Sequence, residues 1–104
     1  MDQSSLLLYC NTLTGKLYKI LPLWESKDKG DLGAEMYQKY IKSLAREMIG
    51  AIETYPILNE EVSYISIINT LNFLRSNEIT HSECRFEVFK MIHQLEQVNS
   101  NLEK

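Results

Sequence analysis

Apolar residues recur along this chain at alternating steps of four and three positions. A helix advances about 100° per residue, so this spacing gathers the apolar side chains of a segment on one helix face. Three segments hold six such residues each: Leu6, Cys10, Leu13, Leu17, Ile20 and Trp24; Tyr37, Ile41, Leu44, Met48, Ala51 and Tyr55; and Cys84, Val88, Met91, Leu95, Val98 and Leu102. A shorter run follows the same steps: Tyr64, Ile67, Leu71 and Leu74. The spacing predicts helices over residues 4–24, 34–55, 60–75 and 81–99.

Polar and turn-forming residues separate these segments. Residues 25–33 are mostly polar or charged and contain two glycines, which is typical of a loop. Pro56 predicts the end of the second helix, because the residue before a proline is pushed out of the helical conformation. We expect Asn59 to cap the third helix, with Glu60 and Glu61 in its first turn, where the helix dipole favours negative charge.

A capping box predicts the start of the last helix. Thr80 and Glu83 stand three residues apart, so that each side chain can accept a hydrogen bond from the backbone amide of the other residue. Residues 76–79 form the connection before it. Short connections return successive helices antiparallel, so the sequence predicts a single domain, residues 1–104, folded as an all-α antiparallel bundle of four helices.

The first segment also allows a second fold. Several of its interior residues are poor helix formers: Asn11, Thr12, Thr14, Gly15 and Pro22. Residues 11–15 could form the turn of a hairpin between residues 6–10 and 16–21. The alternative fold is therefore an N-terminal β-hairpin packed on three helices, although the apolar spacing favours the helix.

Composition limits the partners that the chain can bind. Its formal charge is −3 and its isoelectric point about 5.3, which disfavours nucleic acid because phosphate binding depends on clustered Lys and Arg. No apolar run approaches the roughly 20 residues that cross a bilayer, and the first ten residues lack the basic start of a signal peptide. We expect a cytoplasmic protein that does not bind membranes, with both cysteines, Cys10 and Cys84, reduced in the core.

Catalytic and metal-binding patterns are weak. His81 and Cys84 could meet on one helical turn as a base and a thiol nucleophile. Glu87 and His93 could join them as zinc ligands. However, His81, Cys84 and Glu87 spread over about 120° of the helix, so they do not surround one point. The glycines match neither phosphate-loop nor dinucleotide-binding spacing. We therefore expect no cofactor, no metal and no enzymatic activity.

Arg75 and His81, with five residues between them, resemble the Arg-His element of HEPN-type ribonucleases, in which four to six residues separate the pair. Those proteins are also small helical domains. The resemblance covers seven of the 104 residues, and Ser76 stands where that family often has Asn. It implies RNA cleavage, with His81 as acid or base and Arg75 stabilising charge on the phosphate. An RNA-processing or nucleic-acid-binding domain is thus the alternative function, and its RNA contacts would include a basic stripe: Lys39, Lys42 and Arg46.

The fourth helix has more apolar surface than one core stripe. With Cys84 at zero, Phe86, Phe89 and His93 fall at about 140–200° and Ile92 at about 80°. Such a helix either sits deep in the core or carries a surface for another protein. We expect a non-enzymatic protein–protein interaction module, regulatory, inhibitory or adaptor in role, that binds a protein partner or a second copy of itself. Small bacterial immunity proteins share this size and class. The expected contact residues are Phe86, Phe89, Ile92 and His93.

Overall fold

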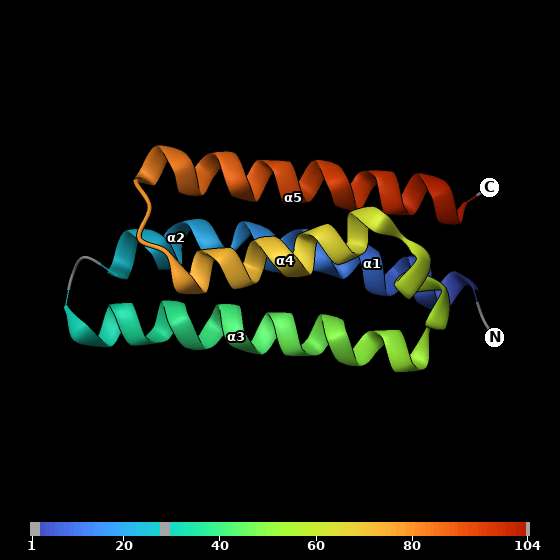
Figure 1. Ribbon diagram of the computed structural model, residues 1–104, viewed down its shortest axis with the longest axis horizontal. Helices are drawn as coiled ribbons and strands as arrows, with labels where there is room; N and C mark the ends of the chain where they lie inside the picture. Colours follow the sequence, from blue (N-terminus) through green and yellow to red (C-terminus); the bar gives the residue numbers. More distant parts are fainter. Residues whose placement is uncertain (1–2, 28–29, 104) are drawn as a thin grey trace.

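The computed structural model describes residues 3–27 and 30–103, which form an all-α bundle of four helical segments (Figure 1). Successive segments run in opposite directions. The first segment consists of α1 (Gln3–Tyr18) and α2 (Ile20–Ser26), and the others are α3 (Asp31–Thr54), α4 (Val62–Ser76) and α5 (His81–Leu102). Helix α5 packs on α1 and α4, while α3 packs on α2 and α4. No strand occurs in the described ranges, so the four-helix prediction is confirmed and the hairpin alternative is wrong.

The first segment is helical throughout except for a break at Lys19. Pro22 explains this position, because a proline ring has no N–H and collides with the carbonyl four residues earlier, which here belongs to Tyr18. Hydrogen bonds on either side of the proline keep the chain helical, from the Lys19 amide to the Gly15 carbonyl and from the Leu23 amide to the Lys19 carbonyl. The two helices therefore continue one apolar face, and its six predicted core residues are all buried.

The segment between α3 and α4 differs from the prediction. Residues Pro56–Glu60 form a short 3-10 helix, η2, so Asn59 does not cap α4. Glu61 takes the N-cap position and its side chain makes no capping hydrogen bond, so neither Glu60 nor Glu61 lies in the first turn. The cause is tertiary: Leu58 is completely buried, and holding it in the core keeps this segment wound between the two helices.

The remaining boundaries lie close to those expected. Helix α3 begins at Asp31, after Gly30, whose φ of 132° is a backbone conformation that favours glycine. The capping box at Thr80 and Glu83 is present, with Glu83 N–H donating to Thr80 Oγ1 at 3.1 Å and Thr80 N–H donating to Glu83 Oε1 at 2.9 Å. Helix α5 runs on to Leu102, which is itself buried, beyond the expected end at residue 99.

One hydrophobic core joins all the helices. The predicted stripes of α4 and α5 are buried at every position, and in the predicted stripe of α3 only Ala51 and Tyr55 are partly exposed. The buried Tyr64 hydroxyl donates to the Met48 carbonyl oxygen at 2.6 Å and ties α4 to α3. No helix in the described part of the chain has the length and apolar character that crossing a membrane requires.

Candidate protein-binding surface

All three phenylalanines of the chain lie on the surface. Phe86 is 66% exposed, and Phe73 and Phe89 are each 43% exposed. Phenylalanine is among the residues most often buried, and here leucine, isoleucine, methionine and tyrosine fill the core without it. Phe73 belongs to α4 and the other two belong to α5, so the exposed rings come from neighbouring helices.

The exposed rings connect into one band across three helices. Phe73 and Phe86 line the same open groove, of about 370 Å³, between α4 and α5. Phe86 and Phe89 are three residues apart, one helical turn, so their side chains are neighbours on α5. Phe89 then meets Tyr18 at the end of α1, with ring centroids 6.0 Å apart at 75°. We call these four residues, Tyr18, Phe73, Phe86 and Phe89, the aromatic band.

Charged side chains border the aromatic band on both sides. Glu83 and Glu87 line the groove beside Phe73, and Glu87 is paired with Lys90 at 2.7 Å. On the other side the Arg85 guanidinium lies 5.8 Å from the centre of the Phe89 ring, within the range of a cation–π contact. An apolar centre with a charged rim is the usual layout of a protein interface.

The four expected contact residues of α5 do not all reach this surface. Phe86, Phe89 and His93 are exposed, but Ile92 is only 6% exposed and belongs to the core, which corrects its place among the contact residues. The buried arc of α5 extends towards Ile92 because the helix packs on both α1 and α4. Two band residues, Phe73 and Tyr18, were missed. Phe73 lies about 200° from the core residue Leu71 on its helix. The angular argument that placed Phe86 outside the core would therefore have placed Phe73 there too.

The environment of Cys84 disfavours the thiolate that a cysteine nucleophile needs. Its side chain is fully buried, and burial raises the pKa of the thiol to about 11, so that it stays protonated. His81 is engaged elsewhere, because its ring stacks on Trp24 at 5.1 Å and its Nε2 lies 3.4 Å from a Glu25 carboxylate oxygen. Nor do His81, Cys84, Glu87 and His93 converge on a metal site: residues 3–27 and 30–103 hold no group of three or more acidic, histidine or cysteine residues that could bind a metal ion.

The residues of the alternative ribonuclease site have separate partners. Arg75 contacts the Asn72 side chain at 3.4 Å, and within the described ranges no hydrogen bond, ion pair or ring contact joins it to His81. Lys39, Lys42 and Arg46 are exposed along α3, and Lys39 is paired with Glu35 at 2.8 Å. This pair lowers the pKa of Glu35 and raises that of Lys39, as expected for a solvated ion pair on a helix face.

Comparison with protein-family models, with curated proteins and with solved structures finds no match for this chain.

Proposed function

We propose that this protein is a non-enzymatic interaction module, regulatory, inhibitory or adaptor in role, that binds another protein through the aromatic band. The observation that carries the proposal is that all three phenylalanines are exposed, that Phe73 and Phe86 line one groove, and that Phe89, one turn from Phe86, contacts Tyr18. Aromatic side chains supply much of the binding energy at interfaces, and contiguous exposed apolar patches usually mark one.

The contact proposed here is reversible rather than obligate. The accessible surface of the chain is 6228 Å², close to the roughly 6,000 Å² that scaling predicts for a folded monomer of its mass. The helices thus bury their core without help from a second chain. A partner that binds such a surface contributes an apolar anchor for the groove between Phe73 and Phe86, and polar groups for the charged rim.

Site-specific photocrosslinking tests the proposal. A photoreactive phenylalanine analogue placed at Phe86 should give a discrete crosslinked product in cells, because the ring there faces the partner. The matched control is the same analogue at Leu8, which is also 66% exposed but lies on α1 outside the aromatic band. Adding Phe89→Asp should abolish the product at position 86 and leave the circular dichroism of the chain unchanged.

Mass spectrometry of the crosslinked product and light scattering of the purified chain identify the partner. A product of twice the chain mass, with a concentration-dependent mass in solution, makes the partner a second copy; any other product makes it a different protein. Equal crosslinking from positions 86 and 8, or a product unaffected by Phe89→Asp, would rule out the aromatic band as the binding surface.

The ribonuclease alternative receives less support, since Arg75 and His81 are held by different neighbours and the basic residues of α3 are interleaved with acidic ones. A single assay separates the two functions. RNA cleavage by the purified chain that disappears in His81→Ala would replace the proposal made here.

A further inference from the structure

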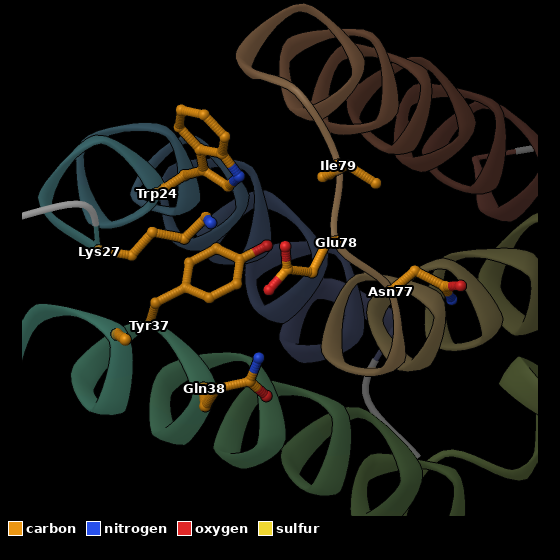
Figure 2. Close-up of a pocket in the computed structure, with 8 residues that line it drawn as sticks. Trp24, Lys27, Tyr37, Gln38, Asn77, Glu78 and Ile79 are labelled. Atoms are coloured by element: carbon orange, nitrogen blue, oxygen red, sulfur yellow. The ribbon is translucent and has the colours of Figure 1, made fainter. Parts of the chain in front are cut away.

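A polar pocket lies at the end of the bundle opposite the two termini, apart from the aromatic band. The end of α2, the start of α3 and the connection from α4 to α5 enclose about 120 Å³ there (Figure 2). Trp24, Tyr37 and Glu78 contribute polar atoms from these three elements. The pocket is therefore built from segments that are distant in sequence.

Two hydrogen-bonding groups in this pocket are buried without a partner. Trp24 is 8% exposed and Tyr37 is 3% exposed, and neither the indole Nε1 nor the tyrosine hydroxyl has a hydrogen-bond partner among the described residues. In Figure 2 the Trp24 Nε1 atom and the Tyr37 hydroxyl both point towards the side of the pocket to which Glu78 belongs. Buried polar groups in folded proteins are nearly always hydrogen-bonded, so two that share one pocket call for a hydrogen-bonding partner from outside the chain.

Both groups act as donors. An indole N–H can only donate, and burial raises the pKa of the Tyr37 hydroxyl, with Cys84 contributing, so that this group keeps its proton. The Lys27 ammonium lies 4.9 Å from the centre of the Trp24 ring and adds positive charge to the same side. The complementary group on a ligand is an acceptor with negative charge, such as a carboxylate.

A third lining residue, Glu78, offers the reverse chemistry. Glu78 is exposed and lines the pocket, and its carboxylate can pair with a cationic donor such as an ammonium group. A volume of about 120 Å³ limits the occupant to a small molecule of a few heavy atoms. Stacking of His81 on Trp24 holds the indole in place before any ligand arrives.

We propose that this pocket binds a small zwitterion of the size of glycine or alanine, with its carboxylate on the Trp24 N–H and Tyr37 O–H groups and its ammonium group towards Glu78. Binding at this site is a further activity and does not depend on the aromatic band.

The single tryptophan makes the site directly observable. Trp24 is the only tryptophan of the chain, so its indole N–H gives one resonance in a ¹H–¹⁵N spectrum. Titration of the full chain with glycine or alanine should shift this resonance saturably, since a carboxylate would accept its hydrogen bond. Acetate and methylammonium each carry one of the two charged groups of the zwitterion, and each should bind at least about tenfold more weakly. Leucine should be excluded by its size.

Two tyrosine variants on the same helix separate ligand binding from folding. Tyr37→Phe removes one donor and should weaken glycine binding about five- to tenfold while leaving the fold intact, because the hydroxyl has no partner in the protein. The control is Tyr40→Phe, whose hydroxyl donates to the Lys16 carbonyl oxygen at 2.7 Å outside the pocket, and it should bind glycine normally. Glu78→Gln should reduce the preference for glycine over acetate.

The proposal is overturned if neither glycine nor alanine shifts the indole resonance saturably at concentrations that detect a millimolar dissociation constant. Water alone then fills the pocket. Equal affinity in wild type and Tyr37→Phe would also reject it, because the binding would not involve the buried donors.

Discussion

Burial raises the pKa of several side chains in this bundle. Cys10 and Cys84 are both fully buried, and burial raises the pKa of each thiol to about 11, against an ordinary value of 9.0. Tyr9 behaves in the same way, with a pKa raised to about 12 chiefly by burial. Each of these three groups is neutral in the folded chain at neutral pH.

The raised thiol pKa values predict a loss of stability at alkaline pH. Below pH 9 the thiols are protonated in both the folded and the unfolded chain, so their contribution to the free energy of unfolding is fully present. Between about pH 9 and 11 the unfolded chain releases these protons while the folded chain keeps them, so the free energy of unfolding falls as the pH rises. Urea unfolding across this range should show the urea midpoint decreasing.

Thiol labelling gives the matching kinetic measurement. At pH 8 a disulfide reagent should modify Cys10 and Cys84 only slowly in the folded chain and rapidly in urea, because the thiolate forms only after the site opens. Rapid labelling of either cysteine in the folded chain at this pH would contradict the burial that we describe.

Among the helices, α5 has the most complete start signal. Its capping box satisfies two backbone amides that would otherwise lack partners, those of Thr80 and Glu83. Neither α3 nor α4 has a side chain that caps its first turn. The capping box also fixes where the chain leaves the α4–α5 connection and enters the helix that carries Phe86 and Phe89.

Thr80→Ala should therefore destabilise the protein by about 1 kcal/mol, because the Glu83 amide loses its acceptor. Urea unfolding should show a lower midpoint with an unchanged slope. Ser82→Ala is the control, since Ser82 is exposed in the same first turn and makes no capping bond. If the two variants were equally stable, the capping box would contribute nothing to folding.

At the scale of the whole molecule, α2 and α3 pack closely against each other near the connection between them. A Cβ atom added to Gly33 would fall on the backbone carbonyl of Ser26, far inside contact distance, so the two helices approach each other through this glycine. Gly50, in the penultimate turn of α3, has no atom near the position of its missing side chain. The same substitution at the two glycines thus tests packing against helix propensity.

Gly33→Ala should lower stability by about 1–3 kcal/mol, because backbone must move to accept the new methyl group. Gly50→Ala should raise stability by up to about 1 kcal/mol, because Gly50 is exposed and alanine has a higher helix propensity than glycine. Thermal unfolding followed by circular dichroism compares both with wild type. A Gly33→Ala variant as stable as Gly50→Ala would show that α2 and α3 do not pack this closely.

The candidate surface was only partly predictable from the sequence. Phe86 and Phe89 could be placed outside the core from their angles on one helix, but Ile92 could not be assigned, because the width of the buried arc depends on how many helices surround α5. Contact between Phe89 and Tyr18 joins residues 71 positions apart. Trp24 and Tyr37 were predicted as core residues, and nothing in their spacing indicates that their polar atoms face a shared pocket.

The last three helices, the core faces and the capping box at Thr80 could be predicted from the sequence, because each depends on spacing within one helix, where geometry is local and regular. For the first segment the spacing favoured a helix over a hairpin, and the structure decided between them. Tertiary structure decided the 3-10 turn that buries Leu58, the burial of Ile92, the aromatic band and the polar pocket. These features arise where different helices meet, and the distance and rotation between packed helices are set by side chains from all of them together.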